Sequence, residues 1–117
     1  RKTVREELEL SEKWGNSPGE LIAILGIDKL LDSHPLELKQ AEKKRLGMAL
    51  AYGEHRKIVI LDEPTQYQDN EGFERIIAAL KLILGEGKGV LVISHDPRLD
   101  TAILDSKTIR LSRADSY

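Results

Sequence analysis

The sequence predicts an α/β fold in which two parallel strands, joined by a helix, follow a largely helical first half. The first observation is an apolar run at residues 58–61 that ends in two carboxylates, Asp62 and Glu63. The second is another apolar run, residues 90–93, that ends in Ser-His-Asp. Apolar residues recur at helical spacing between the two runs. Strand, helix and strand form a βαβ unit with parallel strands and a right-handed crossover.

Residues 58–61 read Ile-Val-Ile-Leu, a composition typical of a strand that is buried on both faces. Carboxylates at the end of such a strand are costly unless they face a ligand crevice at the carboxyl edge of the sheet. Parallel strands bring Asp62, Glu63 and His95 to the same edge. Carboxylates there suit a hydrated Mg²⁺ and a water molecule to be activated. The plainer alternative is that Asp-Glu-Pro only caps a helix or forms a turn.

The first half of the chain is expected to be helical. Residues 17–20, Ser-Pro-Gly-Glu, are a typical helix start, with Ser17 as the N-cap, and Gly26 suits a left-handed helix stop. Residues 28–31 are expected to form a short helical turn. Pro35 then interrupts the chain, because the residue before a proline avoids the helical region. A second helix is predicted from residue 39 to residue 52, and a last strand near residues 107–111.

Composition limits the possible classes of protein. The chain has 117 residues, a formal net charge of −2 and no cysteine, so it has no disulfide frame and no thiolate metal site. Its apolar runs are too short to span a membrane, and its start is not a signal peptide. The first residue is not Met, which suggests a piece of a longer protein. We expect a helical subdomain at residues 1–55 and an α/β part at residues 56–117.

These motifs resemble the ATP-binding subunits of ABC transporters, specifically the carboxyl-terminal half of one. Residues 58–65 resemble the Walker B strand with its catalytic glutamate, residues 66–69 the D-loop, and residues 94–96 the switch-histidine loop. Residues 35–38 and 43–46 resemble the surroundings of the signature motif. The resemblance covers essentially the whole chain and implies an ABC-type P-loop NTPase fold. The proline before the signature and the Gln-Asp ending of the D-loop are most similar to energy-coupling-factor and cobalt-type importers.

The resemblance implies ATP and Mg²⁺ as cofactors, and a role for each matching residue. Asp62 would hold Mg²⁺ through its water shell, since Mg²⁺ prefers few carboxylates and several waters. Glu63 would orient the attacking water and His95 would contact the γ-phosphate, with Glu63 and His95 as the catalytic residues. Asp69 would couple two subunits across a dimer.

The signature motif departs from the family pattern, which is usually Leu-Ser-Gly-Gly followed by Gln or Glu. In the family this motif approaches the γ-phosphate bound on a partner subunit, and glycine permits that approach because it has no Cβ. The helix N-terminus would remain an anion site, and an ammonium group could partly replace the serine hydroxyl. We therefore expect a weakened nucleotide contact from the residues that stand here, namely Lys39, Gln40, Ala41 and Glu42.

A Walker A motif, Gly-x-x-x-x-Gly-Lys followed by Ser or Thr, is absent from the sequence. Residues 85–89, Gly-Glu-Gly-Lys-Gly, lack the hydroxyl residue and lie between a helix and a strand, which is the wrong order. By itself the chain is therefore expected neither to bind nor to hydrolyse ATP. In the family the Walker A strand lies between the strand that ends at His95 and the last strand. Without it, the chain would have to be completed by another segment, rearranged or assembled with other copies.

The resemblance implies a second ABC ATPase subunit and a transmembrane transporter subunit as partners, and a cytoplasmic location at the inner face of the cell membrane. The implied function is to power transport of a small solute. One alternative is a fragment of an SMC-type DNA-repair ATPase, which shares the Asp-Glu-Pro-Thr and Ser-His-Asp elements. Against it, the chain shows no sustained heptads and no basic face, so nucleic acid is not the favoured partner. Another alternative is a non-catalytic interaction module of a split ABC protein.

Overall fold

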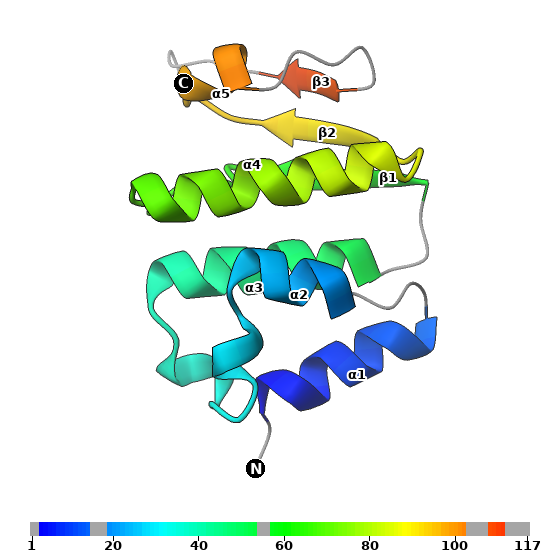
Figure 1. Cartoon of the computed structure of the whole chain (residues 1–117), viewed down its shortest axis with the longest axis vertical. Coiled ribbons are helices and arrows are strands. Elements are labelled where there is room, and N and C mark those ends of the chain that lie inside the picture. The colour runs from blue at the N-terminus through cyan, green and yellow to red at the C-terminus, as the bar shows by residue number, and fades with distance from the viewer. Residues whose placement is uncertain (1–2, 15–18, 54–56, 103–107, 112–117) are drawn as a thin grey trace, which may run out of the picture.

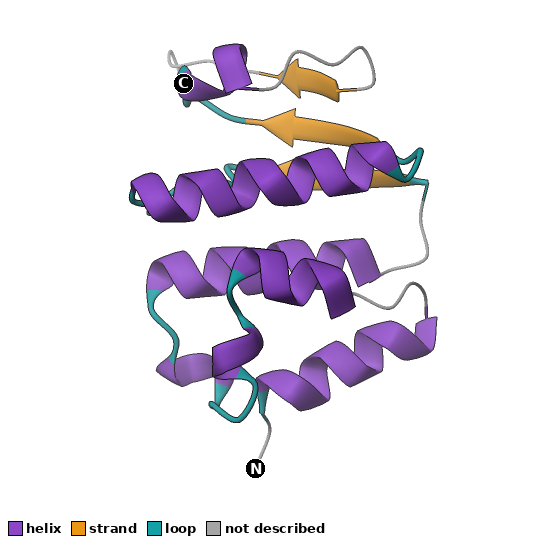
Figure 2. Ribbon diagram, viewed as in Figure 1, coloured by secondary structure: helices purple, strands orange, loops and turns teal. Residues whose placement is uncertain are grey.

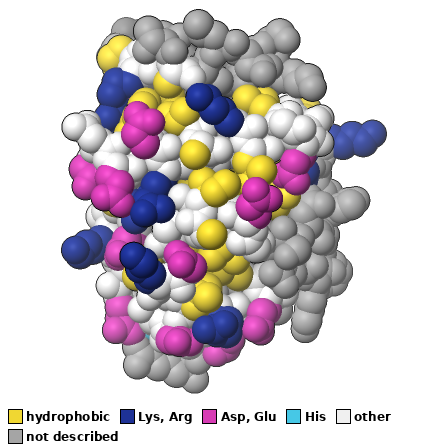
Figure 3. All heavy atoms as spheres, in the orientation of Figure 1, with side chains coloured by type: hydrophobic (Ala, Val, Ile, Leu, Met, Phe, Trp, Pro, Cys, Tyr) yellow, Lys and Arg dark blue, Asp and Glu magenta, His cyan; other side chains and the backbone are white. Residues whose placement is uncertain are grey.

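The computed structural model describes residues 3–14, 19–53, 57–102 and 108–111. The strands gather at one end of the molecule and α1 lies at the other, with α2 and α3 between them (Figures 1 and 2). Charged side chains of both signs are interspersed among hydrophobic ones on the face shown in Figure 3. The elements in chain order are α1 (Val4–Trp14), α2 (Gly19–Leu25), η1 (Asp28–Leu30), η2 (Pro35–Glu37), α3 (Gln40–Gly53), β1 (Ile58–Asp62), α4 (Asn70–Gly85), β2 (Gly89–Ile93), α5 (Arg98–Ala102) and β3 (Thr108–Leu111).

The described strands form one parallel sheet with the order β1-β2-β3. β1 pairs with β2 from Ile58 opposite Gly89 to Asp62 opposite Ile93, so the two strands end side by side. α4 connects them, as the sequence predicts for a βαβ unit. The α/β fold class predicted from the sequence is therefore confirmed.

The prediction that residues 58–61 are buried on both faces is wrong. Val59 and Leu61 are buried, whereas Ile58 and Ile60 are each 57% exposed. Burial alternates because successive side chains of a strand point to opposite faces, and only one face of β1 packs into the core. The composition of β1 is that of a fully buried strand, but among the described residues β1 forms the sheet edge and has one uncovered face.

The last strand takes a rearranged position, which is one of the three outcomes expected when the Walker A strand is missing. In the family that strand separates it from the strand that ends at His95. In the structure β3 pairs directly with β2, from Thr108 opposite Val90 to Leu111 opposite Ile93. This direct pairing satisfies backbone groups of β2 that would otherwise lack a partner, which explains why the rearranged sheet forms.

The helices follow the predicted pattern closely. α3 begins and ends one residue later than the helix predicted at residues 39–52, and α4 lies between the two strands, where apolar residues recur at helical spacing. Gly26 ends α2 with a φ of 72°, as predicted for a left-handed stop. The Arg75 guanidinium lies against Gly26 and donates to the carbonyl of Ile24 at 3.1 Å, so α4 caps the end of α2. The predicted N-cap Ser17 lies outside the described residues.

The break at His34-Pro35 contains more structure than the sequence indicates. The His34 ring nitrogen Nδ1 accepts a hydrogen bond from the backbone N–H of Leu36 at 3.1 Å. The backbone N–H of His34 donates in return to the Glu37 carboxylate at 3.1 Å. These two bonds form a capping box around η2, with His34 in the place where Ser or Thr is usual. They fix the direction in which the chain enters α3.

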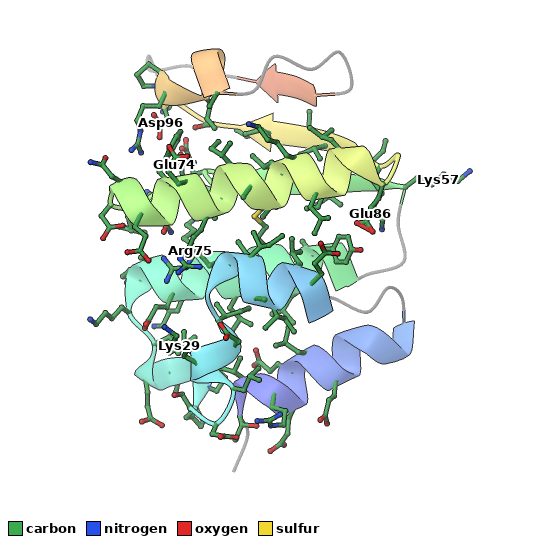
Figure 4. The ribbon with its side chains drawn as sticks, in the orientation of Figure 1. Lys29, Lys57, Glu74, Arg75, Glu86 and Asp96 are labelled. Carbon is green, nitrogen blue, oxygen red and sulfur yellow. The ribbon has the colours of Figure 1, made fainter. Side chains whose placement is uncertain are left out.

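A polar contact joins α3 to the turn after α4. The Tyr52 hydroxyl lies 2.8 Å and 2.9 Å from the two carboxylate oxygens of Glu86, and the Lys88 ammonium lies 4.9 Å from the centre of the Tyr52 ring. Burial first, and then the hydrogen bond to Glu86, raise the pKa of Tyr52 to about 12. The contact lies at the opposite end of the sheet from Asp96 (Figure 4).

We predict that Tyr52→Phe lowers the free energy of unfolding by about 1 kcal/mol, because it removes the hydrogen bond but keeps the ring. The raised pKa adds a pH test. Stability from the neutral hydroxyl is complete below pH 10 and is lost as the pH rises toward about 12, so wild type should lose stability there relative to the variant. Urea unfolding at pH 7, 10 and 11 measures both effects, and parallel pH profiles for the two proteins would contradict the assignment.

Candidate active site at the carboxyl edge of the sheet

The residue after β1 is held in an unusual backbone conformation. The Glu63 N–H donates to the Ile93 carbonyl at 2.7 Å, which extends the β1–β2 ladder by one bond. The φ of Glu63 is 51°, in the left-handed region that is uncommon for residues other than glycine. Strained conformations of this kind cluster at functional sites, where surrounding contacts hold them.

The structure brings Glu63 and His95 together, as the sequence predicts. His95 Nδ1 lies 3.7 Å from Glu63 Oε1, although the two residues are far apart in the sequence. The side chains are 46% and 22% exposed, respectively, so both reach solvent at this edge. Asp62, the last residue of β1, is exposed beside them. A carboxylate that faces an imidazole at a solvent-accessible strand end can orient a water molecule and exchange protons with it.

A network of hydrogen bonds connects the loop after β1 with the loop after β2. The buried Thr65 hydroxyl donates to Asp96 at 2.7 Å. The backbone N–H of Asp96 donates to the buried Ser94 hydroxyl at 3.0 Å. Arg98 then donates to both carboxylate oxygens of Asp96, with a shortest distance of 2.7 Å. His95 is therefore flanked by two residues whose side chains are fixed.

The charge of Asp96 is stabilised within this network. The hydrogen bonds from Arg98, aided by that from Thr65, outweigh burial and lower the pKa of Asp96 to about 2. The hydrogen bond to Asp96 in turn raises the pKa of Arg98. The Asp96 side chain is 15% exposed and Arg98 is 42% exposed, so water partly screens the pair.

Asp69, the predicted dimer-coupling residue, is the N-cap of α4, and its carboxylate accepts from the Gly72 N–H at 2.8 Å. Its neighbour Gln68 reaches the helical part of the chain. The Gln68 amide donates to the Ala41 carbonyl at 3.0 Å and accepts from Arg45 at 2.9 Å. The loop before α4 is therefore bonded to the first turns of α3.

The four residues at the signature position lie at the start of α3. The Lys39 N–H donates to the Glu42 carboxylate at 2.8 Å, so Glu42 occupies one of the unpaired N–H groups at this helix start. Lys39 and Gln40 are exposed, while Ala41 and Glu42 are partly buried. Gln68 thus joins Ala41 to the loop before α4, and the Glu42 carboxylate accepts a hydrogen bond at the start of its own helix.

A cavity of about 330 Å³ lies between α3 and β1. It borders Asp62 and the signature residue Gln40, and the Lys44 ammonium donates to the Asp62 carbonyl at 3.2 Å. The residues that line it are Gln40, Lys43, Lys44, Gly47, Met48, Ala51, Ile60, Leu61, Asp62 and Pro64.

The donor set at this edge fits Mg²⁺ bound mainly by water and phosphate. Within the described part of the chain, no group of three or more His, Cys, Asp or Glu side chains could hold a metal ion by itself. Mg²⁺ is commonly held by one or two carboxylates together with substrate phosphates and waters, so a single exposed Asp62 is compatible with it.

Several residues of the site were not singled out from the sequence. The sequence pattern gives no role to Arg98, and it includes Arg45 and Gln68 only as members of motifs. Their contacts join elements that are distant in the sequence, and periodicity carries no information on such pairs. A weak signal for Arg98 was available, because it follows Asp96 by two residues, a spacing at which a carboxylate can cap the start of a short helix.

Solved structures place the chain in the fold class of ABC ATPases. The dimeric structure of a bacterial ABC transporter cassette matches it with a TM-score of 0.70 at 24% identity, over 95% of this chain and 53% of the cassette. An ATP-binding subunit of an ABC transporter matches with a TM-score of 0.76 at 21% identity, over 95% of this chain and 49% of that subunit. The fold is therefore that of part of an ABC-type P-loop NTPase domain.

The homologues of the chain are ATP-binding proteins of ABC transporters. It is 36% identical to the lipoprotein-releasing system ATP-binding protein LolD of Novosphingobium aromaticivorans, over 79% of this chain and 41% of LolD. It is 34% identical to the putative HMP/thiamine import ATP-binding protein YkoD of Bacillus subtilis, over 89% of this chain and 20% of YkoD. The chain thus spans less than half the length of these relatives. No family model matches it. None of the described helices has the length and apolar character needed to cross a membrane.

The Gln68 side chain bridges the Ala41 carbonyl and Arg45, and this Gln68 bridge predicts different effects of two Gly→Ala substitutions. Gly47→Ala should stabilise the chain by about 1 kcal/mol, because its Cβ meets no atom and alanine favours the helix. A Cβ at Gly72 would collide with Gln68 Oε1 and displace the amide from Ala41 and Arg45. We expect this loss to cancel the helix gain, so Gly72→Ala should be at least about 1 kcal/mol less favourable than Gly47→Ala.

Urea unfolding of both variants measures this difference, and a Gln68→Ala background serves as the control. In that background Gly72→Ala should recover the stabilisation, because there is no amide left to displace. Equal stabilisation by both substitutions in the wild-type background would show that the bridge contributes nothing.

The lowered pKa of Asp96 predicts a specific response to acid. A carboxylate with a depressed pKa in the folded state contributes stability that is complete above its ordinary pKa of 3.8 and is lost as the pH falls toward about 2. Asp96→Asn should therefore flatten the decline in the free energy of unfolding between pH 4 and pH 2. Asp32→Asn is the matched control, since Asp32 also pairs with an arginine, Arg5, but is 91% exposed. Equal slopes for the two variants would contradict the prediction.

Proposed function

We propose that the chain forms the water-activating and inter-subunit part of an ATP-binding, ATP-hydrolysing subunit that powers transport of a small solute across a membrane. The observation that carries the proposal is the approach of His95 to Glu63 at the end of two paired parallel strands. The homology to ABC transporter ATP-binding proteins supports it. In this proposal residues 1–55 act as the helical subdomain and residues 56–117 as the α/β part.

Each residue at the edge receives one role. Glu63 orients the attacking water, and its fixed backbone supports that role because positioning accounts for much of phosphoryl transfer. His95 contacts the γ-phosphate from the facing loop. Asp62 is the residue that would hold Mg²⁺, which neutralises phosphate charge when bound. Asp69 links the two ATPase subunits at the start of α4.

The residues at the start of α3 would face the nucleotide held by a partner subunit. The exposed Lys39 and Gln40 offer an ammonium and an amide in place of a serine hydroxyl and a glycine. Ala41 and Glu42 are occupied by bonds within the chain, from Gln68 and from the Lys39 N–H. This arrangement supports a weakened contact with nucleotide. We propose that the chain does not hydrolyse ATP by itself and needs a segment with a Walker A motif.

The partners in this proposal are a second ABC ATPase subunit and a transmembrane subunit that holds the complex at the cytoplasmic face of the membrane. The similarity to YkoD, a putative HMP/thiamine import ATP-binding protein, supports an importer. The proline before the signature and the Gln-Asp ending of residues 66–69 are the reasons for proposing the energy-coupling-factor or cobalt type. A second candidate is an ABC ATPase that acts away from membranes. It is favoured by the structure of a complex of the archaeal ribosomal stalk protein aP1 with the ribosome recycling factor aABCE1, matched with a TM-score of 0.72 at 28% identity, over 81% of this chain and 18% of that chain.

The test is to isolate the protein from its source with a tag on this chain and to measure ATP hydrolysis by the complex. Glu63→Gln should reduce turnover at least about 100-fold while ATP binding is kept, because the water loses its orienting carboxylate. Glu20→Gln, an exposed change on α2, is the control that should leave turnover unchanged. Unchanged turnover in Glu63→Gln would identify a non-catalytic module. Copurification of ribosomes or DNA in place of a transmembrane protein would refute the transport role.

A further inference from the structure

A line of contacts leads from the core of the molecule to the loop after β2. Phe73 on α4 is buried, and the guanidinium carbon of Arg98 lies 4.1 Å from the centre of its ring. Arg98 also donates to both carboxylate oxygens of Asp96. Asp96 in turn accepts from Thr65 in the loop after β1. The proposed function assigns no role to any of these four residues.

We propose that Arg98 is a positioning residue that clamps the loop after β2 onto the loop after β1 and thereby makes His95 face Glu63. Arg98 acts on these two side chains through Asp96. The inference deepens the proposed function and rests on it for its meaning in hydrolysis.

The bond between Thr65 and Asp96 lies close to both facing side chains. Thr65 follows Glu63 by two residues and Asp96 follows His95 by one, so the 2.7 Å bond between Thr65 and Asp96 ties the two loops next to the facing side chains. His95 is 46% exposed, so packing covers only part of its ring. The position of its backbone, set by its neighbours, therefore contributes to the direction in which the ring points.

The contact between Arg98 and Asp96 fixes their relative orientation. A guanidinium is planar and can donate two parallel hydrogen bonds to one carboxylate, which fixes the angle between the groups as well as their distance. The Phe73 ring lies under the guanidinium and limits its rotation. Because α4 packs into the core, the clamp transmits the position of a rigid helix to Asp96.

A merely structural ion pair would add stability without affecting how Glu63 and His95 meet, and NMR separates the two cases. In the full chain at pH 7.5, Glu63→Gln should shift the ring-proton resonances of His95, since it removes a charge 3.7 Å from the imidazole. We expect Arg98→Ala to abolish more than half of that response while the amide spectrum remains that of a folded protein. Arg5→Ala, which removes an exposed Arg–Asp pair elsewhere, should leave the response intact.

Arg98→Lys keeps the charge but cannot donate in the same two-pronged geometry, so it should also lose much of the response. If Arg98→Ala does not fold, the Arg98→Lys variant provides the test. A full response of His95 in folded Arg98→Lys would then overturn the proposal. A full response in folded Arg98→Ala would overturn it directly. The outcome is independent of the ATPase test: an Arg98-dependent response together with unchanged turnover in Glu63→Gln would refute the proposed hydrolysis and leave the positioning role in place.

Discussion

The parallel ladder between β1 and β2 determines where every catalytic candidate lies. Its last strand pair is Asp62 opposite Ile93, and the Glu63 N–H continues the ladder to the Ile93 carbonyl. Parallel pairing in this register ends both strands at one edge, so the loops that follow them start side by side. An antiparallel pairing of the same two runs would put the acidic pair and the histidine at opposite edges. The chemistry of the site therefore depends on strand direction before it depends on any side-chain contact.

Side-chain contacts then refine what the ladder provides. Thr65 and Asp96 join the two loops, and Arg98 holds Asp96 from the side of α4. The left-handed backbone of Glu63 lies inside this framework, where bonds on both sides offset its local cost. Tyr67 has the same feature, with a φ of 68°, and its ring is exposed. The turn between β1 and α4 thus combines a strained backbone with a fixed surrounding network.

Several polar contacts tie the helical part of the chain to the α/β part besides the shared core, and two of them involve α4 or the loop before it. Gln68 bonds the loop before α4 to the start of α3, and Arg75 bonds α4 to the end of α2. Gln68 lies in the loop just before α4, and Arg75 lies within α4. This helix therefore supports both the site and the helical part. A displacement of the start of α3 would pull on Gln68, next to the N-cap Asp69.

The sequence by itself determined the βαβ unit, the helix that became α3, the left-handed stop at Gly26 and the edge at which Glu63 and His95 meet. It could do so because apolar periodicity and strand ends are local signals that tertiary packing preserved. Tertiary structure alone decided that Ile58 and Ile60 are exposed and that β3 pairs with β2, since burial and strand order depend on which neighbours are present. It also decided the bonds of Gln68 and Arg98. Those bonds join side chains from separate elements, and their geometry exists only once the elements have packed.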